Sequence, residues 1–411
     1  MTQLNLITFA SVFQQKEVGA IREAHHELFT ALDSRYEVRI IFEEELAAFL
    51  AEPASAHSLT LVFIATGGTE GMTVRHYAEL PHPLTLLTDG KANSLAASLE
   101  LACWVRQQGG DCRILHADEE QLLNELQLLE ARQALRGLRI GVVGEPSDWL
   151  VSSGVDYQKA CERWGVEYVD LPLSLVDQYY AGQTVDAEVL DIAQRFIAQS
   201  AGCREPGHDE IVKAVRLYKA LARIAREQQL SALTVQCFSL IPTTGTTGCL
   251  ALALLNDEGI VAGCEGDLQS VFTMLLAQRV TGQGAFMANP SRIDAEHDEV
   301  LFAHCTIGLR QTSRYIIRSH FESQSGVAIQ GILPEGPVTV LKVGGHSLER
   351  SMVCDGDIVE NQDDPRKCRT QIRVHLAEPG IARRYFLSNN IGNHHIIISG
   401  HHADLLKALL R

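Results

Sequence analysis

A carboxylate pair follows an apolar run in the second half of the chain. Residues 260–264 have the apolar character of a buried strand, and Glu265 and Asp267 come next, before a helical stretch that reaches Val280. Asp267 suits the N-cap of that helix, because its side chain can accept a hydrogen bond from a free backbone N–H group. Glu265 has no such local role, and an acid at the carboxyl end of a buried strand is unfavourable unless it binds something. We therefore interpret Glu265 as a metal ligand or a general base, with a structural, hydrogen-bonded acid as the alternative.

A segment rich in glycine and threonine precedes this pair. Residues 241–249 follow an expected strand at 232–240 and lead into an expected helix at 250–255. The backbone N–H groups of the segment, together with the hydroxyls of Thr246 and Thr247, could bind a polar ligand at the carboxyl end of a strand. The segment lacks the lysine of a phosphate-binding P-loop. A plain strand-to-helix turn is the alternative interpretation.

Two adjacent histidines precede the last apolar run of the chain. Residues 391–395 are Ile-Gly-Asn-His-His. Successive residues of a strand point to opposite faces, so His394 and His395 cannot both enter one pocket if the strand is regular. The pair therefore supplies one candidate ligand, and the other histidine belongs to the core or the surface.

Further polar side chains follow expected strands in the C-terminal part of the chain. His304 comes directly after an apolar run, and His320 and Glu322 lie in the polar segment 318–323. These three side chains could line a sugar pocket, or they could be hydrogen-bonded structural residues. Arg369 could donate hydrogen bonds to an oxygen-rich ligand.

Strands and helices that alternate along the first two thirds of the chain must position these residues. Apolar runs followed by helical stretches recur there, which is typical of parallel sheets covered on both faces. Beyond residue 290, short β-like runs separated by Gly and Pro turns replace them. The sequence therefore predicts an α/β protein with two tandem doubly wound α/β domains, residues 1–136 and 137–288, followed by a small antiparallel, barrel-like β-rich domain, residues 289–411. Glu265 falls in the second domain and His394 in the third.

The composition argues against two classes of partner. A formal net charge of −16 over 411 residues disfavours nucleic acids and anionic membranes, which both require a basic surface. The N-terminus lacks the basic region of a signal peptide, and the apolar runs are far shorter than the ~20 residues of a membrane helix. The ten cysteines form no CxxC pair, which favours reduced thiols. We therefore expect a cytoplasmic protein that binds neither nucleic acid nor membrane.

Four ordered segments resemble the L-fucose/L-arabinose isomerase-like superfamily, namely residues 262–267, 273–276, 303–305 and 392–395. The resemblance is strongest from residue 241 to the end of the chain. It implies two α/β domains and a β-rich domain, assembled as a homo-oligomer, often a trimer or hexamer, with a site between the second and third domains and near a subunit interface. It also implies an enzyme that interconverts aldoses and ketoses with a divalent metal, commonly manganese, held by two carboxylates and a histidine.

Position by position, the resemblance implies that Glu265 is the first family carboxylate and that His394 is the family histidine. The second carboxylate is expected near the start of the third domain, where the matching residue is Asn289. An amide oxygen can coordinate a hard cation, but an amide is not a useful general base. This departure leaves the metal site and the two-base mechanism open, with Asn289 as a weak ligand or a substrate contact.

These observations predict a carbohydrate-active enzyme, and in particular a metal-dependent aldose–ketose isomerase that acts on a small sugar or sugar derivative through an enediol. Glu265 would act as ligand and base, and His320 or Glu322 would supply the second proton transfer. The expected substrate contacts are Thr246, Thr247, His304, Asn289, Arg369 and Asn393. Two alternatives remain: a metal-independent acid–base enzyme that uses His320 and Glu322, or a non-catalytic sugar-binding protein of the same fold.

Overall fold

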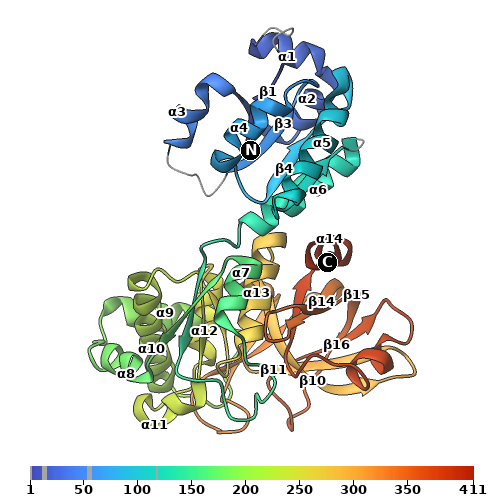
Figure 1. Cartoon of the computed structure of the whole chain (residues 1–411). Helices are drawn as coiled ribbons and strands as arrows, with labels where there is room; N and C mark the ends of the chain where they lie inside the picture. Colours follow the sequence, from blue (N-terminus) through green and yellow to red (C-terminus); the bar gives the residue numbers. More distant parts are fainter. Residues whose placement is uncertain (1, 12–15, 53–57, 117–118) are drawn as a thin grey trace. The chain divides into compact units, whose positions relative to one another are not determined.

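The chain divides into two compact units in a computed structural model that describes residues 2–11, 16–52, 58–116 and 119–411 (Figure 1). The first unit is Met1–Ala134 and the second is Leu135–Arg411. The sheets of the two units are separate.

The first unit is a parallel sheet of five strands in the order β2-β1-β3-β4-β5. Residues Leu4 and Leu6 of β1 face one hydrophobic cluster, and Ile7 and Phe9 face another, as the alternation of a strand requires. Helices α1, α2 and α6 supply the first cluster, and α3, α4 and α5 supply the second. The elements are β1 (Thr2–Phe9), α1 (Val18–Ala24), α2 (His26–Asp33), β2 (Tyr36–Phe42), α3 (Leu46–Leu50), β3 (Ser58–Ile64), α4 (Glu70–His76), β4 (Leu84–Leu87), α5 (Ser94–Gln107), β5 (Cys112–Leu115) and α6 (Glu119–Gln133).

The second unit begins with a parallel sheet of four strands in the order β7-β6-β8-β9. Helix α13 is buried over most of its length because it packs on β8 and β9 of this sheet and also on strands β10, β14 and β17 of the following barrel. The elements are β6 (Arg139–Val143), α7 (Tyr157–Trp164), β7 (Glu167–Leu171), α8 (Leu173–Ala181), α9 (Ala187–Gln199), α10 (His208–Glu227), β8 (Ala232–Val235), α11 (Ile241–Thr244), α12 (Cys249–Asp257), β9 (Val261–Gly263) and α13 (Leu268–Thr281).

The rest of the second unit is built around a closed antiparallel barrel with the strand order β10-β11-β16-β15-β14-β17. A separate ribbon of two strands, β12 and β13, accompanies it. This arrangement confirms the predicted fold class of tandem α/β sheets followed by a barrel-like β-rich part. The elements are β10 (Ala285–Asp294), β11 (Glu299–His304), β12 (Arg314–Arg318), β13 (Ala328–Ile332), β14 (Gly336–Gly344), β15 (Arg350–Asn361), β16 (Thr370–Leu376), β17 (His395–Ser399) and α14 (Ala403–Leu410).

Some helices and strands begin or end at other residues than the sequence predicts. The strand expected over 232–240 stops at Val235, and a 3-10 helix, Cys237–Leu240, follows it directly. The glycine- and threonine-rich segment therefore begins with the short helix α11, which has Pro242 in its first turn, where the missing N–H group is not needed. Strand β10 begins at Ala285, ahead of the predicted boundary at residue 289, and the domain limits themselves remain predictions.

Within the described residues, no single helix has both the length and the apolar character of a membrane crossing. The helical segments Cys237–Thr244 and Cys249–Asp257 are long and apolar enough only when they are taken together, and the chain bends by 115° between them.

Candidate functional site

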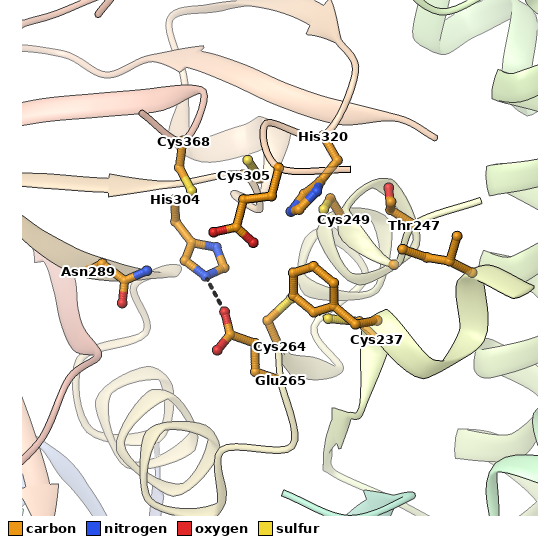
Figure 2. A pocket seen from close by; sticks show the side chains of 14 residues that line it. Cys237, Thr247, Cys249, Cys264, Glu265, Asn289, His304, Cys305, His320 and Cys368 are labelled. Carbon is orange, nitrogen blue, oxygen red and sulfur yellow. Dashed lines mark hydrogen bonds and ion pairs between the residues drawn. The ribbon is translucent and has the colours of Figure 1, made fainter. Parts of the chain in front are cut away.

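A small pocket lies where the carboxyl ends of β8 and β9 meet the strands β10 and β11 of the barrel. It encloses about 50 Å³, which is room for a few water molecules. Figure 2 shows Glu265 and His304 pointing toward each other across this space, with Asn289 beside them and His320 on another side. The lining residues are Cys237, Phe238, Ile241, Thr247, Gly248, Cys249, Cys264, Glu265, Asn289, His304, Cys305, His320, Glu322 and Cys368.

The backbone at Glu265 is turned sharply after β9. Glu265 has a φ of +64°, which is unusual for a residue with a side chain, and Gly266 follows with a φ of +71°. A Cβ atom on Gly266 would lie 2.5 Å from the carbonyl oxygen of Glu145, so only glycine fits there. The N–H group of Ser147 donates to the carbonyl of Glu265 at 2.9 Å. A strained backbone that is fixed in this way is typical of functional residues.

Three side chains converge at this turn. The Oε1 atom of Glu265 lies 3.6 Å from Nε2 of His394 and 3.8 Å from Nε2 of His304. The ligand atoms of all three residues lie within 4.8 Å of one another, so they could hold one metal ion. His394 is completely buried and is not among the residues that line the pocket. It therefore contacts Glu265 from the interior of the protein.

Asp267 fixes the orientation of His394. Its Oδ1 atom accepts a hydrogen bond from the N–H group of Ser270, so the predicted N-cap of α13 is confirmed. Its Oδ2 atom lies 2.9 Å from Nδ1 of His394. Because an ionised carboxylate only accepts hydrogen bonds, Nδ1 is the donor, and Nε2 faces Glu265. A carboxylate behind a histidine is a common device for orienting a metal ligand.

A buried lysine supports Asp267. The Nζ atom of Lys342, on β14, lies 3.8 Å from Oδ2 of Asp267 and donates a hydrogen bond to the hydroxyl of Ser270 at 2.9 Å. Burial would raise the pKa of Asp267, but the charge of Lys342 and the contact with His394 hold this pKa below its usual range. Asp267 is therefore charged although it is buried.

The protonation of the site follows from the same contacts. Burial would raise the pKa of Glu265, yet His304 and His394 hold it well below its usual range, so Glu265 is ionised. Burial would lower the pKa of His394, but Asp267 and Glu265 raise it to about 9. Burial is the main influence that lowers the pKa of His304, and it lowers that of His320 to about 4. A metal ion that binds Nε2 of His394 must therefore displace a proton.

Asn289 lies at the rim of this cluster. It belongs to β10, pairs with Ala303 of β11, and lines the pocket. Its Oδ1 atom is buried and has no hydrogen-bond partner among the described residues, and the same holds for Nε2 of His394. Nε2 of His394 has only the 3.6 Å ion pair with Glu265. Buried polar atoms are nearly always satisfied, so Oδ1 of Asn289 points to a missing ligand.

The pocket brings together most, but not all, of the side chains singled out in the sequence. Thr247, His304, His320 and Glu322 line it with Glu265 and Asn289, whereas, besides His394, the following do not: Thr246, Arg369 and Asn393. The hydroxyl of Thr246 is buried without a partner among the described residues. The substrate contacts proposed for these residues remain predictions.

Two of the residues outside the lining have structural partners. Arg369 donates from Nε to the carbonyl of Ser319 at 2.9 Å. Asn393 is exposed, and its carbonyl accepts a hydrogen bond from Nδ1 of His395. His395 turns away from Glu265 toward the hydroxyl of Tyr385, which confirms that the two adjacent histidines face opposite sides.

The sequence did not reveal every member of the site. His304 was interpreted as a substrate contact, but its position equally suits a metal ligand. The sequence favours a helix cap as the role of Asp267, and the structure adds a contact with His394. The sequence does indicate that Lys342 is buried, because this single lysine interrupts the apolar run 338–343 of an expected strand.

Comparison with known proteins gives no matching family model. The chain is similar to a sulfoquinovose isomerase of Alkalicoccus urumqiensis, at 22% identity over 303 residues, which cover 71% of this chain and 66% of that protein. It is also similar to the sulfoquinovose isomerase of Priestia aryabhattai, at 23% identity over 55% of this chain and 51% of that protein. A sulfoquinovose isomerase of Clostridium sp. (strain MSTE9) is 28% identical over 136 residues, 32% of this chain and 30% of that protein.

The matches thus span between about a third and two thirds of the length of these relatives. Their shared name agrees with the predicted class of sugar isomerases, while the superfamily suggested by the four sequence segments remains a prediction.

Proposed function

We propose that this chain is an aldose–ketose isomerase of a small sugar, with its reaction centre at Glu265. The observation that carries the proposal is the convergence of Glu265, His304 and His394, whose ligand atoms lie within 4.8 Å of one another beside the pocket. The names of the relatives support the same reaction class. The predicted homo-oligomer, cytoplasmic location and site near a subunit interface are part of the proposal.

The donor set fits a divalent metal. One carboxylate and two imidazoles are ligands that manganese, iron, cobalt and zinc all accept. Oδ1 of Asn289, which has no hydrogen-bond partner among the described residues, is suited to the same role. We propose Glu265, His304 and His394 as the ligands, with Asn289 as a weaker fourth and manganese as the metal. When bound, such an ion would polarise the carbonyl and hydroxyl oxygens of the sugar.

The proton transfers would be made by side chains of the chain itself. Glu265 is ionised, so we assign to it the removal of the proton from C2 of the aldose, which leads to an enediol. The protonated Glu265 would then return this proton to C1, which gives the ketose and restores the carboxylate. His320 and Glu322 also line the pocket and are the candidates for proton transfer at the sugar oxygens. The Nδ1 atom of His320 faces the hydroxyl of Ser323 at 3.1 Å, so Nε2 is the nitrogen left for this task.

The first test measures the metal content of the purified protein and of a Glu265→Gln variant, together with deuterium exchange at C2 of a panel of aldoses. We expect metal close to one ion per chain, exchange and ketose formation in the wild type, and loss of both activities in the variant. A protein that binds no metal after incubation with Mn²⁺, and that turns over no aldose, would overturn the proposal.

A second function is favoured by Asn289, which stands where the resemblance implies a carboxylate. In that case His320 and Glu322 would carry out acid–base chemistry on a carbohydrate without a metal. Activity that survives exhaustive chelation would support this alternative, and activity lost on chelation would exclude it. Sugar binding without turnover under any metal would instead point to a non-catalytic protein.

A further inference from the structure

An exposed tryptophan lies beside the proposed reaction centre. Trp149 follows β6, in the segment between that strand and α7, and 54% of its surface is exposed. Its indole N–H group donates a hydrogen bond to Oε2 of Glu265 at 2.6 Å. The other carboxylate oxygen, Oε1, is the one that faces His304 and His394. Trp149 therefore holds Glu265 in the orientation that presents a single oxygen to the two histidines.

The segment that carries Trp149 is anchored to the same turn. The N–H group of Ser147 donates to the carbonyl of Glu265, and the N–H group of Leu150 donates to the carbonyl of Ser147 at 2.8 Å. Leu150 is buried, whereas Val151 is 91% exposed. The backbone on both sides of Trp149 is thus held by hydrogen bonds, and the indole itself is held by its N–H group, which donates to Glu265.

The ring of Trp149 continues an aromatic wall of the pocket. It meets Phe238 edge to face, with ring centroids 5.5 Å apart, and Phe238 meets His320 in the same way at 5.2 Å. Phe238 and His320 line the pocket, and Trp149 lies outside the lining. The wall therefore extends from the reaction centre toward solvent.

The size of the pocket explains why a sugar needs this wall. A cavity of about 50 Å³ has room for a few atoms of a substrate, but a whole sugar is several times larger. Most of the sugar must lie outside, next to the aromatic surface. The C–H bonds on one face of a sugar carry partial positive charge, which is attracted to the negative face of an aromatic ring.

We propose that Trp149 is the platform on which the non-reacting part of the sugar stacks, while its N–H group positions Glu265. The class of ligand in this inference rests on the proposed function. The geometry separates the two roles, because the N–H group belongs to one edge of the indole and the stacking surface to its face. Substitutions can therefore remove them one at a time.

The experiment compares Trp149→Phe, which keeps an aromatic face and loses the N–H group, with Trp149→Ala, which loses both. For the best aldose of the panel, we expect kcat to fall in both variants. KM should rise about tenfold only in Trp149→Ala, equivalent to about 1.4 kcal/mol of binding free energy. Val151→Ala, in the same exposed segment, is the matched control and should keep the wild-type KM and kcat. Because Trp149 is exposed, all variants should melt near the wild-type temperature.

Intrinsic fluorescence reports on binding without turnover. The chain has three tryptophans, so we expect a sugar-dependent change that Trp149→Phe removes and Trp104→Phe retains. Turnover with a KM that does not change in Trp149→Ala would overturn the platform and leave the isomerase intact. A Trp149-dependent fluorescence change with no turnover of any aldose would support the platform and overturn the proposed isomerase activity. Fluorescence that responds to protein concentration and to no sugar would mean that another copy of the chain covers Trp149, which would also overturn the platform.

Discussion

The Nδ1 atom of His394 lies 2.9 Å from the Oδ2 atom of Asp267, and both side chains are almost completely buried. One carboxylate thereby caps helix α13 and orients a histidine that directly precedes the barrel strand β17. The contacts of Asp267 thus connect the start of α13, which follows β9, with the residue that precedes β17 of the barrel. The position of the candidate site is therefore a property of the α/β sheet and the barrel in combination.

Asp267→Asn should lower metal affinity by about 10–100-fold. It should also lower the free energy of unfolding, because the buried Lys342 loses its charged partner, so affinity is measured at a temperature at which the variant is folded. An amide can still cap the helix, but it cannot offer the negative charge that keeps the Nδ1 proton of His394 in place. Calorimetric titration of the apo protein with Mn²⁺ measures the change. Asp186→Asn is the matched control, because Asp186 also caps a helix, α9, and is exposed. Equal affinities for the wild type and Asp267→Asn would contradict this role.

His304→Ala separates two interpretations of His304. A ligand role predicts loss of bound metal, whereas a substrate-contact role predicts normal metal content and a higher KM. We expect the loss of metal, because Nε2 of His304 lies within reach of the ligand atoms of Glu265 and His394. The comparison variant is His320→Ala, which should keep its metal and lose activity. Metal content by elemental mass spectrometry, followed by kinetics at saturating Mn²⁺, decides between the two.

Asn289→Asp tests whether the amide occupies a ligand position. Oδ1 of Asn289 is buried without a partner among the described residues, so a carboxylate there should strengthen binding of a divalent cation about tenfold. Asn289→Ala should weaken it. If both variants bind Mn²⁺ like the wild type, Asn289 contacts substrate or solvent instead of metal.

Local patterns in the sequence predicted the parts of this site that depend on local structure. The N-cap role of Asp267 follows from one carboxylate just ahead of a helical stretch, and the opposite orientations of His394 and His395 follow from strand alternation. Each of these features depends on residues only a few positions apart.

The convergence of Glu265, His304 and His394 could not be predicted in the same way, because it requires β9, β11 and the start of β17 to meet in space. The sequence also gave no sign of β10, since Asn289 and Pro290 interrupt its apolar character. Trp149 stands in an irregular segment without periodicity, so its contact with Glu265 depends entirely on tertiary structure.

An ion pair away from the site should make stability depend on pH. Arg318 is buried and contacts Glu205 through Nε at 2.9 Å. Burial would raise the pKa of Glu205, but Arg318 and the N–H group of Ser319 hold this pKa below its usual range. Since the folded pKa is lower than the unfolded one, the stabilisation is present above the unfolded pKa of about 4.3 and disappears as the pH falls through the folded pKa.

Glu205→Gln should therefore lower the free energy of unfolding at pH 7 by about 1–2 kcal/mol, because a buried Arg318 loses a charged partner. The difference between variant and wild type should shrink below pH 4. Urea unfolding at several pH values measures both quantities. Glu162→Gln, in an exposed position on α7, is the control and should change stability little at any pH. A difference that stays constant from pH 7 to pH 3 would contradict the ion-pair explanation.

The charges of the residues that line the pocket predict a preference for an unsulfonated substrate. The relatives are named for a sulfonated sugar, and a sulfonate is usually bound by Arg or Lys. Among the described residues that line this pocket, none is Arg or Lys, and Glu322 adds a carboxylate. The rings of Trp149, Phe238 and His320, beside which the non-reacting part of the sugar is proposed to lie, also offer no Arg or Lys. An unsulfonated aldose should therefore have a kcat/KM about tenfold above that of sulfoquinovose.

Glu322→Gln provides the matched comparison for this prediction. Because Glu322 is also a candidate for proton transfer, its replacement should lower kcat/KM for both sugars. The loss should be smaller for sulfoquinovose, since only its sulfonate is repelled by the carboxylate. The preference is measured as the ratio of the two kcat/KM values in wild type and variant. A wild-type preference for sulfoquinovose would mean that a cation from outside the lining, on this chain or on a neighbouring copy, completes the binding site.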